Sequence, residues 1–198
     1  MTIEASAPRR KLSAILMIDV AGFSRMMGQD EERTIVLIRE FHERTQGLVE
    51  AHAGRVVDTA GDSVFGEFDS VLNAVRCAQA IQEAQAAANT HRKPAERMEI
   101  RIGVHLGDVI VQDYRVYGDG VNIAARLQTV AEPGSICISE AVYQQVYTKV
   151  DLAFEDRAPH SSLIDGASVS GIASTHPGRL PPNNIYNFGR MQEVWLDK

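Results

Sequence analysis

The sequence predicts an α+β domain in which an antiparallel-rich sheet is flanked by helices. Its 198 residues are 44% hydrophobic, which is enough for one domain with a sizeable core. The strand and helix patterns follow the order β-α-β-β-α-β-β-α-β-α-β, so that pairs of strands alternate with helices. This order favours hairpins within one sheet, with the helices packed on one face.

The first half of the chain contains strands with apolar runs and helices with one apolar face. Leu12 to Val20 is almost entirely apolar, which predicts a buried strand with Asp19 near its end. After the N-cap residue Asp30, apolar residues recur at helical spacing, which predicts an amphipathic helix. The elements expected here are a strand at 12–20, a helix over 30–49, strands at 55–58 and 63–68, and a helix over 70–89.

The second half repeats this alternation after a polar connection at residues 90–97. Gly107 interrupts a long run of strand-forming residues, so one strand is expected on either side of it. Ser139 is a suitable N-cap for the last helix. The elements expected here are strands at 98–106 and 108–112, a helix over 118–130, a strand at 136–138, a helix over 139–147 and a short strand at 151–154.

The composition divides the chain into three parts. Residues 1–10 form a polar lead-in, and residues 11–156 carry the strand and helix patterns. From about residue 157 serine, glycine, proline and asparagine dominate, and apolar residues gather only at 185–188 and 194–196. We therefore expect one folded domain over 11–156 and an irregular tail of unclear role over 157–198.

The charge and the cysteine content exclude several classes of protein. The formal net charge of -6 argues against a nucleic-acid partner, which would require a basic face. Cys77 and Cys137 lie far apart in apolar stretches, which indicates buried residues and neither a disulfide framework nor a zinc site. No run reaches the length of a membrane span, and none has the pattern of a signal peptide. We expect a cytoplasmic protein without a membrane partner.

Two aspartates lie at the ends of predicted strands or directly beside them. Asp19 closes the first strand, and Asp62 lies in the tight turn between the next two. From spacing alone, a turn or capping role for each is the simpler interpretation. If the strands are neighbours, however, both carboxylates reach one end of the sheet, as a two-metal site for phosphoryl chemistry requires. The turn Gly22-Phe23-Ser24, between a strand and a helix, offers backbone N–H groups to phosphate oxygens.

Four motifs resemble those of the catalytic domain of class III adenylate and guanylate cyclases of the bacterial type. They occur in family order over about residues 11–156. The resemblance implies the class III nucleotidyl cyclase fold, a ferredoxin-like-derived antiparallel-rich sheet with flanking helices. MIDVAGFS at 17–24 and AGDS at 60–63 are similar to the two metal-binding motifs of the family. RIGVHLG at 101–107 is similar to the motif of its central strand. YGDGVNIAARL at 117–127 is similar to the helix that carries its transition-state residues.

The resemblance implies a head-to-tail homodimer with two active sites at the interface. One chain would supply Asp19, Asp62 and Arg101 to each site, and the other would supply Asn122 and Arg126. Arg126 would stabilise charge at the α-phosphate, Asn122 would orient the ribose, and Arg101 would bind the terminal phosphates. Positions four apart lie on one face of a helix, so Asn122 and Arg126 can point into one site.

The resemblance also implies how metals and phosphates are held. Two Mg²⁺ or Mn²⁺ ions per site would bind Asp19 and Asp62, and the carbonyl of Val20 would add a ligand. The turn at residues 22–24 would provide backbone N–H groups from Gly22, Phe23 and Ser24 to the phosphates. Such a site catalyses attack of the ribose 3′-hydroxyl on the α-phosphate, with release of pyrophosphate, mostly by positioning and charge stabilisation.

Two positions that choose the base depart from the adenylate cyclase pattern. Adenylate cyclases carry Lys three residues before the Gly-Asp that is Gly61-Asp62 here, and Asp or Thr three residues before the helix-opening Gly. This chain has Asp58 and Arg115 at these positions. The exchanged pair can still recognise adenine, or Asp58 can accept from guanine while Arg115 donates to its O6. Alternatively, the two side chains pair across the interface and select no base. A bidentate contact discriminates between bases by ~1–3 kcal/mol. We expect ATP as the substrate, with GTP as the alternative.

The tail is a second departure from the family pattern. Relatives close the domain with a lysine that contacts the triphosphate, whereas this chain has no lysine between residue 157 and Lys198. This departure allows a weak or low-affinity enzyme. The alternative from another class is a cyclase-like domain that binds nucleotide or dimerises without turnover, but the intact residues Asp19, Asp62, Asn122 and Arg126 favour the enzyme. A diguanylate cyclase is disfavoured, because no Gly-Gly-Asp/Glu-Glu-Phe-like turn is present.

Overall fold

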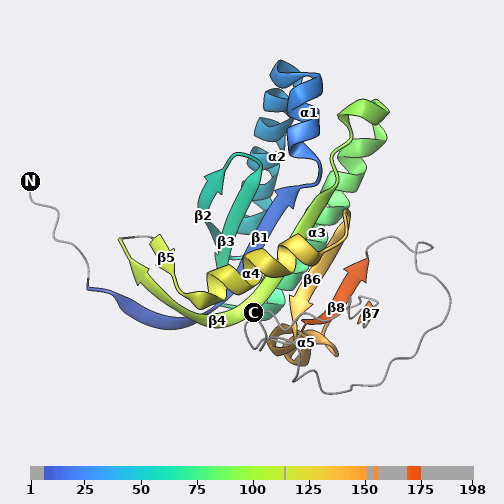
Figure 1. The fold of residues 1–198 in the computed structure, drawn as a ribbon. Coiled ribbons are helices and arrows are strands. Elements are labelled where there is room, and N and C mark those ends of the chain that lie inside the picture. The colour runs from blue at the N-terminus through green and yellow to red at the C-terminus, as the bar shows by residue number, and fades with distance from the viewer. Residues whose placement is uncertain (1–6, 114, 151–153, 156–168, 175–198) are drawn as a thin grey trace, which may run out of the picture.

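Figure 1 shows the fold of the computed structural model, which describes residues 7–113, 115–150, 154–155 and 169–174. The described strands form one sheet in the order β2-β3-β1-β4-β6-β8-β7, and β5 also pairs with β4. Only β4 and β6 run parallel among these pairs, so the sheet is mostly antiparallel, as predicted. The strands are β1 (Arg9–Val20), β2 (Gly54–Ala60), β3 (Ser63–Phe68), β4 (Ile100–Gln112), β5 (Arg115–Tyr117), β6 (Ser135–Ser139), β7 (Phe154–Glu155) and β8 (Val169–Ser174). The helices are α1 (Phe23–Gln29), α2 (Glu31–Ala51), α3 (Val71–Thr90), α4 (Asp119–Val130) and α5 (Glu140–Val146), with a short 3₁₀ turn, η1 (Pro94–Glu96).

The two longest strands, β1 and β4, are neighbours and pair along the whole of β1. β4 runs without interruption through Gly107, so the prediction of separate strands at 98–106 and 108–112 is wrong. A Cβ on Gly107 would lie 2.9 Å from Nε2 of His105 and 3.3 Å from the Cα of Gly120. The glycine therefore permits close packing within the strand instead of forming a turn. The chain turns only after Gln112, where β5 pairs back onto β4.

Helices cover both faces of the sheet. Successive residues of a strand point to opposite faces. Leu16 and Ile18 of β1 pack in the main core with residues of α2 and α3, whereas Ile15 packs in a second cluster with Ala124 of α4. In Figure 1, α4 crosses one face of β1 and β4 while α2 and α3 lie on the other. The expectation of helices on one face is therefore wrong, because the order of elements does not reveal to which side a helix returns.

Side chains cap two of the helices: Asp30 caps α2 as predicted, and Ser70, at the start of the helix predicted over 70–89, caps α3. Ser139 is the N-cap residue of α5, but its side chain makes no capping hydrogen bond. Oδ1 of Asp30 accepts the N–H of Arg33 at 2.9 Å, and the hydroxyl of Ser70 accepts the N–H of Asn73 at 3.3 Å. Such caps contribute about 1 kcal/mol each. Between Gly22 and Asp30, where only a turn is expected, the chain forms the short helix α1.

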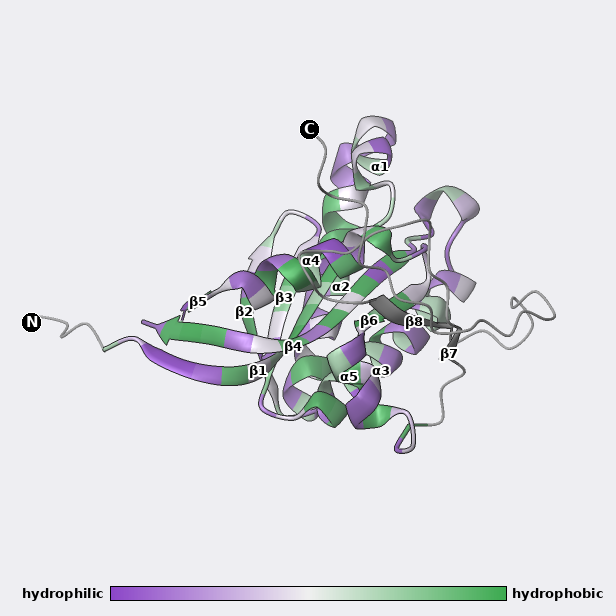
Figure 2. Cartoon of the chain, turned by 60° about the horizontal axis from the view of Figure 1, so that its bottom comes forward, coloured by the Kyte–Doolittle hydropathy of each residue, from purple (hydrophilic) through white to green (hydrophobic). Residues whose placement is uncertain are grey.

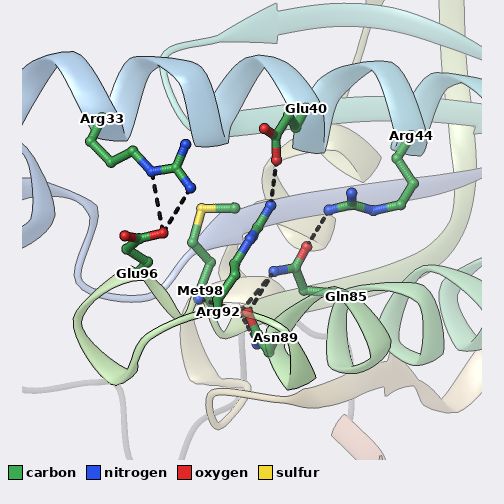
Figure 3. Close-up of polar contacts among 8 residues, drawn as sticks. All are labelled: Arg33, Glu40, Arg44, Gln85, Asn89, Arg92, Glu96 and Met98. Carbon is green, nitrogen blue, oxygen red and sulfur yellow. Dashed lines mark hydrogen bonds and ion pairs between the residues drawn. The ribbon is translucent and has the colours of Figure 1, made fainter.

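Polar side chains connect α2 and α3 to the segment that leads into β4, as Figure 3 shows. Gln85 and Asn89 of α3 both donate to the carbonyl of Met98, at 3.0 and 2.7 Å. Arg92 is largely buried and donates to Glu40 of α2 at 2.7 Å. These contacts hold the segment before β4 against α2 and α3.

Part of the range expected to be an irregular tail belongs to the sheet. β8 lies within residues 157–198 and pairs antiparallel with both β6 and β7. The strand expected at 151–154 overlaps β7 at Phe154, and residues 151–153 lie outside the described residues. The apolar runs at 185–188 and 194–196 also lie outside them.

The interior is apolar and contains both cysteines. Cys77 and Cys137 are buried, as predicted, and burial raises the pKa of each thiol to about 12. Figure 2 shows hydrophobic residues along most of β4, while the outer end of β1 is hydrophilic. Among the described residues, no helix is both long enough and apolar enough to span a membrane.

Candidate active site

Asp19 lies near the end of β1, directly opposite Arg101 of β4. Directly opposed residues of an antiparallel pair have Cβ atoms about 5 Å apart, within reach of a short carboxylate and a long guanidinium. Arg101 donates to both oxygens of Asp19, from Nε to Oδ1 at 2.9 Å and from Nη2 to Oδ2 at 2.5 Å. The Asp19 side chain is 18% exposed and that of Arg101 is 27% exposed. The structure therefore places Arg101, which we expected at the terminal phosphates, on a predicted metal ligand.

Asp62 reaches the same end of the sheet from the turn between β2 and β3. The preceding Gly61 has a φ of 59°, a left-handed conformation that glycine adopts without strain. The Oδ2 atom of Asp62 accepts the N–H of Val20 at 3.2 Å. Because Val20 directly follows Asp19, this hydrogen bond places the Asp62 carboxylate beside the backbone that carries Asp19.

The donor set at this place suits a hard divalent cation. Asp19, Asp62 and the Val20 carbonyl offer only oxygen atoms, which Mg²⁺ and Mn²⁺ prefer. One or two carboxylates are the usual protein contribution to a Mg²⁺ ion that also binds substrate phosphates. In the part of the chain that the structure describes, no group of three or more His, Cys, Asp or Glu side chains gathers as a metal site. The residues fit metal ions that are completed by a phosphate substrate.

The turn at Gly22 lies next to these carboxylates. Gly22 has a φ of 76° and is the N-cap of α1, where its carbonyl accepts the N–H groups of Arg25 and Met26. Phe23 and Ser24 are the first two residues of α1. Their N–H groups have no acceptor within the helix, as is general for a first helical turn. Their contact with phosphate oxygens stays a prediction.

Asn122 and Arg126 both lie on α4 and are exposed to solvent. They are four residues apart, so they share one face of the helix. The residues between and beyond them, Ala124 and Leu127, are buried against the sheet. The exposed face of α4 therefore points away from the strands that carry Asp19.

Gly103 of β4 positions α4, and sequence analysis treated it only as part of a motif. A Cβ on Gly103 would come closer than 3.0 Å to the backbone oxygen of Ala124 and the backbone nitrogen of Gln128. The absence of a side chain thus lets α4 lie directly on the strand. A glycine inside a strand is a signal for such a close approach. At the end of the helix, Nη1 of Arg101 lies 3.5 Å from the carbonyl of Thr129.

Asp58 and Arg115 lie on different edges of the structure. Asp58 is exposed on β2, beside a register shift, and its Oδ1 accepts the N–H of Thr59 at 2.8 Å. Arg115 is exposed on β5, opposite Gln112. Three strands, β3, β1 and β4, separate β2 from β5. Their joint contact with one base stays a prediction.

The structure also shows a pocket of about 340 Å³ between α2 and the β2–β3 hairpin, which contains none of the predicted site residues. His42 lines it, and its Nε2 is buried without a hydrogen-bond partner. Burial lowers the pKa of His42, and the charge of Asp62 raises it by less, so the ring is neutral at pH 7. Sequence reasoning missed this residue, because a half-buried histidine on an amphipathic helix gives no distinct signal. The pocket is lined by Ile35, Ile38, Arg39, His42, Glu43, Gln46, Val56, Thr59 and Val64.

Comparison with known proteins places this arrangement in a family. The family model described as the adenylate and guanylate cyclase catalytic domain matches residues 6–167, which include all four motifs. The chain belongs to this family. The match confirms the resemblance, and the structure shows the α+β fold with flanking helices that it implies.

Individual relatives agree with this assignment. The putative adenylate cyclase 3 of Rhizobium meliloti is 43% identical over 153 residues, which are 77% of this chain and 26% of that protein. The adenylate cyclase of Streptomyces coelicolor is 27% identical over 183 residues, which are 92% of this chain and 44% of that protein. The chain thus spans less than half the length of these two curated relatives. A solved adenylate/guanylate cyclase/hydrolase from Silicibacter pomeroyi is 34% identical with a TM-score of 0.72, and the match covers 84% of this chain and 97% of that one.

Proposed function

We propose that this domain converts ATP to 3′,5′-cyclic AMP and pyrophosphate, as a phosphorus–oxygen lyase of intracellular signalling in the cytoplasm. The convergence of Asp19 and Asp62 at one end of the sheet carries the proposal, because two carboxylates beside a phosphate-binding turn suit a metal–nucleotide substrate. Membership of the cyclase family and the adenylate cyclase names of the two curated relatives support it.

The chain's own residues supply positioning and charge. Bound Mg²⁺ or Mn²⁺, two per site, would activate the ribose 3′-hydroxyl and neutralise the triphosphate. Asp19, Asp62 and the Val20 carbonyl hold these cations. The backbone N–H groups of Phe23 and Ser24 orient the phosphates, since a first helical turn has donors to spare.

A second copy of the chain completes the site in this proposal. Arg126 stabilises the charge that develops at the α-phosphate, and Asn122 holds the ribose so that its 3′-oxygen lies in line with the leaving pyrophosphate. The outward direction of both side chains supports this arrangement, because an exposed face of α4 is available to another protomer. Arg101 serves the terminal phosphates once its guanidinium leaves Asp19.

Recognition of the base rests on Asp58 and Arg115. Arg115 donates to N1 of adenine, and Asp58 accepts from its 6-amino group. A guanylate cyclase is the second candidate, because the exposed carboxylate of Asp58 is equally suited to accept from N1–H and the 2-amino group of guanine. The adenylate cyclase names of the two curated relatives favour ATP.

A product assay tests the proposal. The full chain is incubated with ATP or GTP and Mn²⁺, and the cyclic product is identified by mass spectrometry. We expect cyclic AMP as the main product. Formation of cyclic GMP alone would instead establish the guanylate cyclase. Absence of both products would favour the nucleotide-binding or dimerisation domain.

The substitution Asp62→Ala tests the assigned site in the same assay. It should lower turnover about 100-fold or more, as loss of a charge-stabilising group does. It removes one hydrogen bond, to Val20, so the melting temperature should fall by only a few degrees. Asp69→Ala is the matched control. Asp62 directly precedes β3, and Asp69 directly follows it. Asp69 is exposed and forms an ion pair with Lys11. Equal turnover in both variants would remove Asp62 from the site.

A further inference from the structure

The contact between Arg101 and Asp19 engages the same atoms that the proposed chemistry needs elsewhere. Both oxygens of Asp19 accept from Arg101, through the Nε–Nη2 edge of the guanidinium. This fork geometry is the strongest form of arginine–carboxylate pair. While it holds, Asp19 offers a cation fewer lone pairs, and that edge of Arg101 cannot bind phosphate.

The pairing of β1 with β4 places the backbones of Asp19 and Arg101 opposite each other. Asp19 and Arg101 are direct partners in the β1–β4 register, which continues along twelve paired positions. Neither strand can shift at this point without breaking that pairing. The pair therefore opens through rotation of side chains and not through movement of the strands, and the long Arg101 side chain is 27% exposed.

A divalent cation on Asp19 and the guanidinium of Arg101 repel one another. Two positive groups on one carboxylate lie only a few ångströms apart, and their repulsion is strong where solvent is partly excluded. The second aspartate differs, because Asp62 receives a neutral backbone N–H from Val20. The two predicted metal ligands thus begin from different electrostatic surroundings.

We propose that Arg101 is a positioning residue that competes with a divalent cation for Asp19, and that binding of the cation releases its guanidinium toward the phosphates. This inference rests on the proposed function for the identity of the second partner, but its first step concerns the cation alone. While it holds Asp19, Arg101 also lies with its Nη1 3.5 Å from the carbonyl of Thr129, at the end of α4. Release from Asp19 would therefore also change this contact with α4.

The inference is tested by binding of Mn²⁺ without nucleotide. Free Mn²⁺ is followed by electron paramagnetic resonance while the full chain is titrated, for the wild type and for Arg101→Gln. The variant should bind Mn²⁺ about fivefold more tightly, the size expected for loss of a partly exposed ion pair. Arg101→Lys, which keeps the charge but loses the fork, should lie between them. Arg76→Gln, an exposed arginine of α3, is the control for the change in net charge.

Two further measurements keep the test decisive. Mn²⁺ should raise the melting temperature of Arg101→Gln more than that of the wild type, because a ligand stabilises the state that binds it. Addition of Asp19→Asn to Arg101→Gln should abolish the gain in affinity. Equal or weaker Mn²⁺ binding by Arg101→Gln, or a gain that persists without Asp19, would overturn the inference. Because no nucleotide is present, this outcome is independent of whether cyclic AMP or any cyclic product forms.

Discussion

At the scale of single residues, burial in the fold affects the protonation of His105. This histidine lies on β4, beneath α4, the helix that carries Asn122 and Arg126. His105 of β4 is 7% exposed, and its Nδ1 is buried without a hydrogen-bond partner among the described residues. Its Nε2 atom lies beside Gly107, where a Cβ atom would be only 2.9 Å away, and the Cα of Gly120 in α4 approaches the same point. Burial lowers the pKa of His105, because an imidazolium in this apolar place would lose its hydration. The folded protein therefore favours the neutral ring.

This predicts a loss of stability in weak acid. The unfolded chain binds a proton at His105 near pH 6.5, whereas the folded chain binds it only at lower pH. The contribution of the neutral ring is therefore complete above about pH 6.5 and is lost as the pH falls below that value. Urea unfolding at pH 7.5 and pH 5.5 measures the difference. His105→Gln should reduce the loss, and His42 should account for part of the remainder, since burial lowers its pKa as well.

A surface histidine provides the control for this prediction. His91 is exposed at the end of α3, so His91→Gln removes a histidine without removing a buried ring and controls for the substitution itself. The neighbours of Glu67 hold its pKa below 4.5, outside the pH interval used. An identical loss of stability in His105→Gln and the wild type would show that this ring does not carry the effect.

The residues of the candidate site were partly predictable. The position of Asp62 beside the end of β1 follows from strand-end positions and from Gly61, all visible in the sequence. The pair between Arg101 and Asp19 was not predictable, because it depends on the exact register of two strands 82 residues apart. The same holds for the hydrogen bond from Val20 to Asp62. Motifs indicate which residues matter, whereas register decides which atoms meet.

At the scale of elements, the packing of α4 on β4 depends on one missing side chain. A Cβ on Gly103 would collide with backbone atoms of Ala124 and Gln128, and backbone atoms of a helix cannot rotate away. Gly103→Ala should therefore push α4 off the strand and cost about 1–3 kcal/mol of unfolding free energy, the usual range for overpacking. Turnover should fall as well, because Asn122 and Arg126 move with the helix. Chemical denaturation and the product assay measure the two effects.

Gly66→Ala is the matched control for this prediction. Gly66 also lies inside a strand, β3, but a Cβ there would meet only side-chain atoms of Phe68 and Leu16 at 3.5 Å or more. These are ordinary van der Waals distances. The control should therefore change the unfolding free energy far less than Gly103→Ala does. Equal effects of the two substitutions would contradict a special role for Gly103.

The elements themselves were predicted best where the pattern is local. Continuous apolar runs and the cap at Asp30 located most strands and helices, because these signals act within a few residues. Gly107 was misinterpreted as a break, because a glycine that admits Gly120 has the same local sequence as one that turns the chain. The strand β8 was missed because its serine and glycine content gives no alternation. Its place is decided by pairing with β6.

At the scale of the whole molecule, one chain presents the proposed catalytic groups in different directions. Ile15, which packs against α4, is two positions from Met17 and four from Asp19, so Asp19 lies on the face of the sheet that α4 covers. Asn122 and Arg126 lie on the outer side of that helix. The outer parts of β1 and β5 also expose Leu12 and Tyr117, which are 59% and 49% exposed. Both features favour completion of the site by a second copy.

Mixing two inactive variants tests this completion. In a head-to-tail dimer, Asp62→Ala damages one half of each site and Arg126→Ala damages the other half, so each variant alone should be inactive. In a mixed dimer both lesions fall in one site, and the second site keeps Asp62 from one chain and Arg126 from the other. If subunits exchange freely in an equal mixture, half of the dimers are mixed and each has one intact site of two. The mixture should therefore recover about a quarter of wild-type turnover.

A mixture of Asp62→Ala with Asp19→Ala is the control. It should recover no turnover, because both residues belong to the same half of the site. Activity that stays at the level of the separate variants, while sedimentation shows mixed dimers, would mean that Asp62 and Arg126 do not act across an interface.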